Sequence, residues 1–331
     1  MTVPEPEETV ADVLIGHDTD LRRPTGVTVI LLPEGTTAGV DVRGAAPGTR
    51  ETDLLDPVDT IDVADAIVLS GGSAYGLDAA GGVMRWLEEH GRGVAVGPVR
   101  VPIVPAAVLF DLLVGDPAIR PDAEAGYRAC ASAVPLADAE QGSVGAGAGA
   151  TVGKLLGPER AMRGGLGISV RSAHGVTMAA VVTTNAVGDV VDPRTGEVLA
   201  GARRSAGALE PVDTVRALLS DRAHVGASAG GATTIGAVIT DARLTKAQAR
   251  RLAQVAHDGL ARAIRPVHTP MDGDTIFAAG TGAGPPADMT LLGVLAAEVT
   301  AEAVVAGIRA ATGLSLGPVR LPAWRDRAEE R

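Results

Sequence analysis

Aromatic and cysteine side chains are scarce in this 331-residue sequence. It contains two residues each of Phe, Trp and Tyr, although 46% of its side chains are hydrophobic. The core must therefore be built from Ala, Val, Leu and Ile, and too few rings remain for a platform that stacks on nucleic-acid bases. The single cysteine, Cys130, excludes an intramolecular disulfide and a multi-cysteine zinc site. We interpret it as a small buried side chain inside a helix.

Basic side chains are also in the minority. The sequence has 29 Lys and Arg residues against 40 Asp and Glu residues, which gives a formal net charge of −11. The longest basic stretches are pairs, such as those at 22–23 and 250–251. Phosphate binding needs a concentrated basic patch, so we expect no nucleic-acid partner.

Long apolar runs and metal-ligand patterns are missing as well. No uninterrupted apolar run reaches the roughly 18 residues that cross a bilayer. The first 20 residues lack the basic and apolar regions of a signal peptide. We therefore expect a cytoplasmic protein without a membrane partner. The six histidines do not occur at metal-ligand spacing, so we expect no metal site.

What the sequence does contain is a mixture of short strands and amphipathic helices. Residues 1–24 are polar and Pro-rich and suggest an arm or a first edge element, and residues 98–105 suggest a proline-punctuated connection. We predict strands at 26–32, 39–43, 66–70, 176–184, 233–240 and 276–279, and helices at 74–90, 123–133, 245–264 and 288–311. This order predicts sheets covered by helices, either α/β or two packed sheets with helical outer layers.

Two glycine-rich stretches match catalytic or nucleotide-binding motifs in residue type but lack the strand and helix context that these motifs require. Residues 226–230 (GASAG) match the serine elbow around Ser228, but that motif needs a strand before it and a helix after it, and here a strand follows. The Gly/Ala run at 145–150 has no strand leading into it, and Leu155 replaces the Ser/Thr that a phosphate-binding loop requires after Lys154. We interpret both stretches as loops.

The junction before Thr233 is more informative. A small-residue loop runs directly into this threonine, which begins a predicted strand, and a tight acidic turn at 272–275 precedes another strand. In a self-cleaving precursor, the Thr233 hydroxyl would attack the preceding carbonyl, and the released amine would then serve as the base. An α-amino group has a pKa of about 7.7–8, which suits this role at neutral pH. The alternative is an ordinary loop-to-strand junction.

Residues 233–282 also resemble a known family. This stretch (TTIGAVITDARLT…HTPMDGDTIFAAGTG) is similar to the small subunit of the DmpA-like N-terminal-nucleophile hydrolases. These include L-aminopeptidase/D-esterases, β-aminopeptidases and nylon-oligomer hydrolases. The threonine and the Asp-Gly-Asp turn are closest to the nylon-oligomer (6-aminohexanoate-oligomer) branch. The similarity covers nearly the whole chain and extends to 46–57, 69–89, 151–167 and 181–197.

The resemblance implies an architecture and a maturation step. The fold would be α/β (α+β), a four-layer αββα sandwich in a single domain, 1–331. Cleavage between Ala232 and Thr233 would leave a large subunit, 1–232, and a small subunit, 233–331. The family implies no cofactor and a homo-oligomer, such as a tetramer of processed pairs.

Five site residues are assigned by the same resemblance. Thr233 matches the nucleophile, and Asp272 and Asp274 match the acidic pair that positions it and its amine. Lys154 matches the active-site lysine, expected to hold the carboxylates ionised, and Asn185 matches the asparagine that donates to the oxyanion. The loops 71–75 and 142–154 are expected to form the substrate pocket, with Gly72 and Tyr75 as substrate-binding residues.

Three functions remain open at this stage. The first is hydrolysis of linear amides, either short peptides or 6-aminohexanoate oligomers, through an acyl-enzyme on Thr233. The second is a strict L-aminopeptidase/D-esterase or β-aminopeptidase that needs a free substrate amine. The third is an unprocessed, non-catalytic scaffold, because Ala232 stands where the nylon-hydrolase pattern has Asn.

Overall fold

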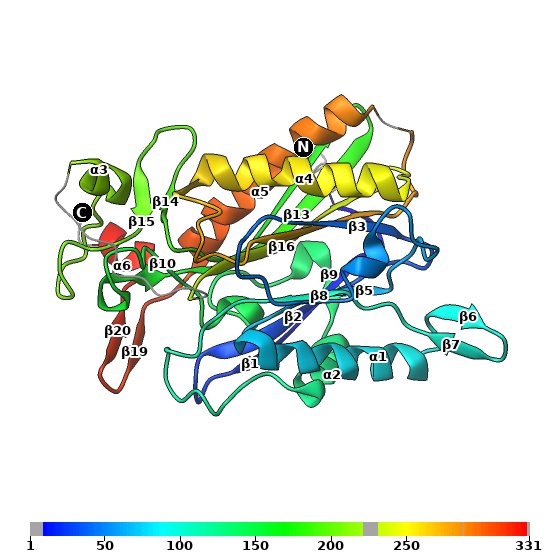
Figure 1. Ribbon diagram of the computed structural model, residues 1–331, viewed down its shortest axis with the longest axis horizontal. Helices are drawn as coiled ribbons and strands as arrows, with labels where there is room; N and C mark the ends of the chain where they lie inside the picture. The colour runs from blue at the N-terminus through cyan, green and yellow to red at the C-terminus, as the bar shows by residue number, and fades with distance from the viewer. Residues whose placement is uncertain (1–8, 221–230, 287, 330–331) are drawn as a thin grey trace, which may run out of the picture.

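The computed structural model describes residues 9–220, 231–286 and 288–329. Its main body has four layers, which Figure 1 shows from bottom to top: two helices, a six-stranded sheet, a five-stranded sheet, and two long helices. This arrangement is the αββα sandwich expected from the sequence. The Ser228 motif and His224 lie outside the described residues.

The six-stranded sheet is covered by two helices, α1 (Ala79–Glu89) and α2 (Ala123–Ala131). Its side chains alternate strictly along strand 66–70: Ala66 and Val68 face the helices, and Ile67 and Leu69 face the other sheet. Both faces are buried, so the strand is apolar throughout. The strand order is β4 (Thr49–Arg50), β8 (Ala106–Val108), β5 (Ala66–Ser70), β2 (Thr25–Leu31), β1 (Leu14–Asp20), β9 (Val134–Pro135).

The five-stranded sheet is covered by α4 (Lys246–Ala263) and α5 (Met289–Ala310). Phe277 and Ile239 point into the layer between the sheets, whereas Ile276 and Val238 pack under the helices. The strand order is β12 (Gly165–Ala173), β13 (Val176–Asn185), β16 (Thr233–Thr240), β18 (Thr275–Gly280), β3 (Thr37–Val42). Only β16 and β18 run parallel within this sheet, so both begin at the same edge.

Smaller elements surround this body. Short 3₁₀ helices include η2 (Ser73–Asp78) and η4 (Gly145–Gly147), and two short α-helices are α3 (Thr214–Leu219) and α6 (Trp324–Glu329). The small sheets consist of β6 (Val94–Val96) with β7 (Val99–Val101), β10 (Thr151–Val152) with β11 (Met162–Arg163), β14 (Asp189–Val191) with β15 (Val198–Ala200) and β17 (Ile264–Arg265), and β19 (Leu314–Leu316) with β20 (Val319–Leu321).

Helix α5 is long and apolar enough, by length and composition, to cross a membrane. In the structure it packs against β12, β13 and α4, and 61% of its most apolar window is buried. Its hydrophobic composition is therefore accounted for by its position over the five-stranded sheet.

Most of the predicted elements are present, and the capping box at Thr245 and Gln248 opens α4 as expected. Two local predictions differ from the structure, and one long strand was missed. β1 is not an edge strand, because β9 pairs on its other side. The proline-punctuated connection at 98–105 contains β7 of a small hairpin. The edge strand β12 was not predicted at all.

Candidate active site

The topology brings the N-termini of β16 and β18 and the C-terminus of β13 to one edge of the five-stranded sheet. Asn185, the last residue of β13, pairs directly with Thr233, the first residue of β16. The Asp272-Gly273-Asp274 turn leads into β18, and Ala232 forms an isolated parallel bridge with Asp272. Residues distant in sequence thus meet around the Ala232–Thr233 peptide bond.

This peptide bond is buried. Thr233 is 3% exposed and Ala232 is fully buried. The Thr233 hydroxyl donates a hydrogen bond to the Ala232 carbonyl oxygen, and the Gly273 N–H donates to the same oxygen at 3.2 Å. The nucleophile candidate and the carbonyl that precedes it are therefore in direct contact in the uncut chain.

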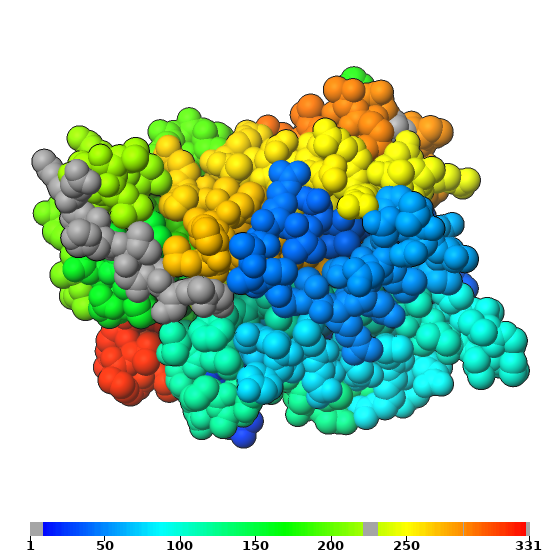
Figure 2. Space-filling view, in the orientation of Figure 1, coloured from blue at the N-terminus to red at the C-terminus, as the bar shows by residue number. Residues whose placement is uncertain are grey.

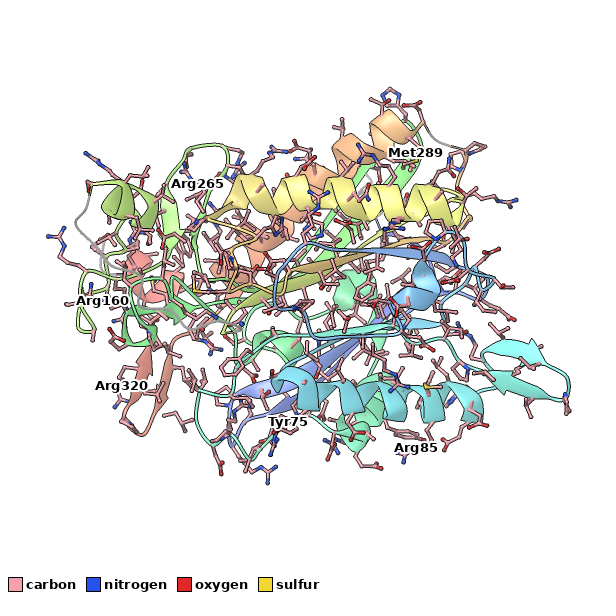
Figure 3. All side chains as sticks on the ribbon, viewed as in Figure 1. Tyr75, Arg85, Arg160, Arg265, Met289 and Arg320 are labelled. Atoms are coloured by element: carbon pink, nitrogen blue, oxygen red, sulfur yellow. The ribbon has the colours of Figure 1, made fainter. Side chains whose placement is uncertain are left out.

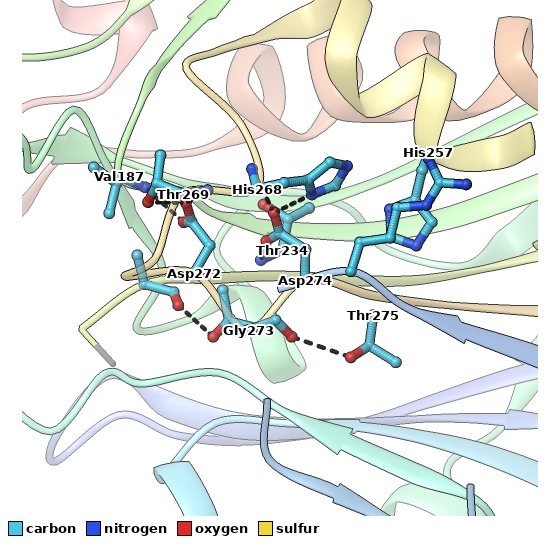
Figure 4. Close-up of polar contacts among 12 residues, drawn as sticks. Val187, Thr234, His257, His268, Thr269, Asp272, Gly273, Asp274 and Thr275 are labelled. Carbon is cyan, nitrogen blue, oxygen red and sulfur yellow. Dashed lines mark hydrogen bonds and ion pairs between the residues drawn. The ribbon is translucent and has the colours of Figure 1, made fainter. Parts of the chain in front are cut away.

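Asp274 is held between the start of β16 and a histidine (Figure 4). Its Oδ1 accepts a hydrogen bond from the Thr234 N–H at 2.6 Å. Its Oδ2 accepts from the N–H of His268 at 3.2 Å and from the His268 ring at 2.7 Å. Because a carboxylate can only accept, Nδ1 of His268 is the donor. The His268 ring packs edge-on against His257, with the ring centroids 4.8 Å apart.

Asp272 is fixed by the loop before it and by the segment after β13. Its Oδ2 accepts from the N–H and the hydroxyl of Thr269, at 2.9 and 2.6 Å, and its Oδ1 accepts from the Val187 N–H at 3.3 Å. Burial and the neighbouring charge of Asp274 raise the pKa of Asp272. The two carboxylates thus lie close enough to interact through their charges.

Lys154 and Asn185 form the other side of the site. The Lys154 Nζ donates to the backbone oxygen of Asn185 at 2.9 Å and to its side-chain oxygen at 2.8 Å. The Asn185 side-chain oxygen also accepts from the Thr151 N–H at 2.9 Å, and its Nδ2 donates to the Phe110 carbonyl at 3.0 Å. The Asn185 amide is therefore fixed in orientation by three partners.

The electrostatics of Lys154 differ from the expectation. We expected the lysine to hold the acidic pair ionised, but its hydrogen bonds go to the neutral oxygens of Asn185. Burial lowers the pKa of Lys154 to about 7, even though the charges of Asp272, Asp111 and Asp274 favour its protonated form. The desolvation of the amine outweighs these attractions, so Lys154 can exchange a proton near neutral pH.

A buried ion pair supports this side of the site, and sequence reasoning missed it. The Arg23 guanidinium lies 2.6 Å from Asp111 Oδ1, and both side chains are fully buried. Asp111 also accepts from the Thr25 hydroxyl at 2.6 Å and from the Gly72 N–H at 2.8 Å. Because Asp111 directly follows Phe110, this network fixes the carbonyl that orients Asn185.

His268 was the other functional neighbour that the sequence did not reveal. The six histidines do not occur at metal-ligand spacing, so that criterion does not distinguish any of them. The usable signal was the four-residue distance from His268 to the acidic turn.

A cavity of about 700 Å³ opens beside Lys154. Its walls come from the segment after β8, the loop around Pro158 and the β19–β20 hairpin, and Figure 2 shows this hairpin region, in red, beside a teal segment of the N-terminal half. Thr151 and Lys154 are among its polar lining residues, and the apolar walls include Phe110, Leu113, Val114, Pro158, Val319 and Leu321.

The two expected substrate-binding residues occupy different places. Gly72 is connected to the cavity through its hydrogen bond to Asp111, which lines it. Tyr75 is 62% exposed and stacks under Arg120, with 3.7 Å from the guanidinium carbon to the ring centroid. Figure 3 shows Tyr75 near the α1 layer, apart from Arg320 of the cavity wall. The structure thus does not bring Tyr75 to the other site residues.

The described part of the chain contains no candidate metal site. There, no group of three or more His, Cys, Asp or Glu side chains is arranged to hold a metal ion.

Comparisons with known proteins match nearly the whole chain. The family profile of peptidase family S58 matches residues 9–317. An uncharacterised aminopeptidase of Mycobacterium tuberculosis is 48% identical over 320 residues, covering 91% of this chain and 89% of that protein. A 6-aminohexanoate-oligomer endohydrolase of Paenarthrobacter ureafaciens is 34% identical over 299 residues, covering 85% of this chain and 80% of that protein.

Two solved structures share the fold at lower identity. A β-aminopeptidase of Burkholderia sp. superposes with a TM-score of 0.69 at 23% identity, covering 100% of this chain and 96% of that chain. The L-aminopeptidase D-Ala-esterase/amidase of Ochrobactrum anthropi, described as a variant of the Ntn hydrolase fold, gives a TM-score of 0.71 at 18% identity, covering 98% and 92%. These matches identify the four-layer architecture as an Ntn hydrolase fold.

Proposed function

Because the chain belongs to peptidase family S58 and is a hydrolase of peptide or amide bonds, we propose that it is a self-processing N-terminal threonine amidohydrolase. In this proposal Thr233 first cleaves the bond to Ala232 and then cleaves linear amides through an acyl-enzyme. The observation that carries the proposal is the contact between the Thr233 hydroxyl and the Ala232 carbonyl oxygen at the edge of the sheet.

The maturation step needs a base other than an α-amine, because the Thr233 nitrogen is still part of a peptide bond. Lys154 fits this role, because burial lowers its pKa to about 7 and a large fraction of the Lys154 side chains therefore carries a neutral amine at physiological pH. Its Nζ donates a hydrogen bond to the backbone oxygen of Asn185, and Asn185 pairs with Thr233 in the sheet. The hydroxyl oxygen attacks the Ala232 carbon, the C–N bond breaks, and water hydrolyses the resulting ester.

The hydrolytic cycle uses the amine that maturation releases. The free Thr233 amine accepts the hydroxyl proton as the oxygen attacks the substrate carbonyl, and it returns that proton to the leaving amine. In this proposal one N–H of the Asn185 Nδ2 donates to the Phe110 carbonyl, its other N–H donates to the oxyanion, and the acidic pair orients the new ammonium group. Water then hydrolyses the acyl-enzyme, which releases the acid and regenerates Thr233. The proposed cycle uses only the side chains of this chain and water.

The cavity supports linear amides with an apolar acyl chain as the substrate class. Its lining is largely apolar and includes Thr151 and Lys154, which donate hydrogen bonds to Asn185, the residue paired with Thr233. The endohydrolase relatives act on 6-aminohexanoate oligomers by name, and such oligomers alternate short methylene chains with amides. Short peptides with aliphatic side chains fit the same description.

A strict aminopeptidase is the second candidate, because the mycobacterial relatives at 48–51% identity are named aminopeptidases. The two functions differ in whether the substrate needs a free amine. Hydrolysis of an N-acetylated linear amide at a rate similar to that of the free amine would support the first function. Complete loss of activity on the acetylated substrate would support the second.

The decisive experiment is the intact mass of the purified chain with N-terminal sequencing of each fragment. We expect two fragments, the smaller beginning Thr-Thr-Ile-Gly, and no fragments from Thr233→Ala. Ser228→Ala is the matched control, because it removes a hydroxyl five residues earlier in the sequence and is expected to process and hydrolyse normally. A wild-type chain that stays uncut and inactive on amides would favour the scaffold interpretation.

A further inference from the structure

We propose that the backbone N–H of Gly273 is the oxyanion donor of the maturation step. This inference rests on the proposed self-processing at Thr233 and identifies the group that stabilises its transition state. The assignment concerns the peptide group inside the acidic turn, rather than the two carboxylates on either side of it.

The geometry at the Ala232 carbonyl supports the assignment. The structure gives this oxygen two donors, the Thr233 hydroxyl and the Gly273 N–H. When the hydroxyl oxygen attacks the carbon, its proton leaves and its hydrogen bond to the carbonyl oxygen is lost. The Gly273 N–H, at 3.2 Å, then remains to meet the negative charge.

The donor is held in position before the reaction. Ala46 donates its N–H to the Asp272 carbonyl at 2.9 Å, and Gly44 donates to the Asp274 carbonyl at 3.1 Å. The Thr275 hydroxyl donates to the Gly273 carbonyl at 3.0 Å, as Figure 4 shows. A donor fixed on both sides needs no reorganisation as charge develops, which is the condition for effective oxyanion stabilisation.

The donor position also explains why residue 273 is glycine. A Cβ atom there would lie 2.4 Å from the Ala46 carbonyl oxygen and 2.9 Å from the Thr233 hydroxyl oxygen. Either the loop at Ala46 or the nucleophile would have to move. The side chain is therefore absent at the point where the turn contacts the hydroxyl that attacks.

The Asn185 side chain does not donate to the Ala232 carbonyl in the uncut chain. Its Nδ2 donates to the Phe110 carbonyl, and its Oδ1 faces Lys154 and Thr151. The geometry thus separates two donors: the Gly273 N–H meets the carbonyl of the chain itself, and the Asn185 amide is adjacent to the cavity that would hold a substrate.

Cleavage of the Ala232–Thr233 bond is an acyl transfer from nitrogen to oxygen followed by hydrolysis. The Thr233 oxygen bonds to the Ala232 carbon, its proton passes to Lys154, and the carbonyl π-electrons move to the oxygen that faces Gly273. The tetrahedral intermediate collapses, the C–N bond breaks, and Lys154 returns the proton to the departing nitrogen. The product is an ester between Ala232 and the Thr233 oxygen, which water hydrolyses to a carboxylate and a free hydroxyl.

The test replaces one N–H by an oxygen atom in the full-length chain. Glycolic acid introduced at position 273 by nonsense suppression converts this peptide bond into an ester and removes the donor while keeping the atoms in place. Precursor made by cell-free translation is followed by mass spectrometry as it cleaves. We expect maturation to slow by about 10²–10³-fold, the usual effect of removing one oxyanion donor.

Glycolic acid at position 91 is the matched control. The Gly91 N–H donates to the Glu88 carbonyl at 2.9 Å in an exposed turn after α1, so its removal deletes a comparable bond far from the site. This control is expected to mature at the wild-type rate. Maturation of the 273 ester at the control rate, with an unchanged melting temperature, would overturn the inference and leave the proposed function intact. Failure of the wild type and the control to cleave would instead refute the proposed function.

A second measurement covers the case in which the 273 ester does not fold. It uses the uncut Thr233→Ala chain, labelled with ¹³C-aspartate and ¹⁵N-glycine. In NMR spectra this pair of labels selects the two Asp–Gly amides, at 258–259 and 272–273. We expect the Gly273 amide to exchange its proton slowly because it is bonded to the Ala232 carbonyl. Exchange at the rate of a free amide would overturn the inference without any change in folding.

Discussion

Replacing Lys154 by Arg is expected to slow maturation strongly without removing the positive charge or the hydrogen-bond donors. The structure places the pKa of Lys154 at about 7, against 10.5 for an ordinary lysine, so burial favours the neutral amine by on the order of 5 kcal/mol. A guanidinium does not lose its proton in this range and cannot act as the base. Loss of a general base slows a reaction by about 10²–10⁴-fold, and we expect a decrease of this size in Lys154→Arg.

The chain offers a direct assay because it contains only two lysines, Lys154 and Lys246. Labelling with ¹³Cε-lysine gives two NMR signals, and Lys246→Arg assigns them. The Lys154 signal is expected to shift with a midpoint near pH 7, and the maturation rate of freshly translated precursor should rise through the same midpoint. Lys246→Arg is also the matched control, because Lys246 is buried and donates to two backbone carbonyls, at 3.0 and 2.9 Å, away from the site.

The sign of the stability effect can be checked in the same titration. Between about pH 7 and 10.5 the unfolded chain keeps the Lys154 proton, whereas the folded chain has lost it. The contribution of Lys154 to the free energy of unfolding therefore rises with pH across this window. A Lys154 signal that titrates near 10.5, or a Lys154→Arg chain that matures as fast as wild type, would refute the reasoning.

Three further predictions concern the surroundings of the site. His268→Ala is expected to lower the free energy of unfolding by about 1.5–3 kcal/mol and to slow maturation, because it removes a donor from Asp274. His268→Asn, which keeps a donor, should restore most of the rate in a kinetic comparison, and equal rates in the two variants would contradict this role. Arg23→Met is expected to cost about 3–5 kcal/mol in urea denaturation, because it leaves the buried Asp111 charge unpaired; a change below 1 kcal/mol would argue against the ion pair. Thr245→Ala removes the cap of α4 and should cost about 0.5–2 kcal/mol with normal hydrolysis, and a loss of activity at unchanged stability would count against a purely local effect.

The four-layer fold was predicted through the family resemblance, whereas the short apolar segments bounded by turn residues predicted only sheets covered by helices. The helix at 245–264 and the strand at 233–240 were located to within a residue or so, since a capping box and an apolar run define them. The strand at 165–173 was missed because Gly165 and Gly167 weaken the strand signal. A Cβ at Gly167 would lie 1.9 Å from the Ala303 carbonyl oxygen, so these glycines allow α5 to pack closely on the sheet.

The residues of the candidate site could be named from the family resemblance, but their electrostatics could not be predicted. Thr233, Asn185, Asp272 and Asp274 follow from the family resemblance and meet at one sheet edge in the structure. The depressed pKa of Lys154 could not be predicted, because it depends on how completely the folded chain removes the amine from water. Arg23 and Asp111 are 88 residues apart, so the contact between them exists only in the folded chain.

The strand order of the five-stranded sheet has a consequence for the two fragments that maturation would leave. β12 and β13 lie on one side of the sheet and β3 on the other, all before residue 233, and they enclose β16 and β18, which come after it. The small fragment is thus joined to the large one along eight residue pairs on one side and six on the other. The cut chain would be an obligate two-chain complex with a shared core, in which separation of the pieces is equivalent to unfolding.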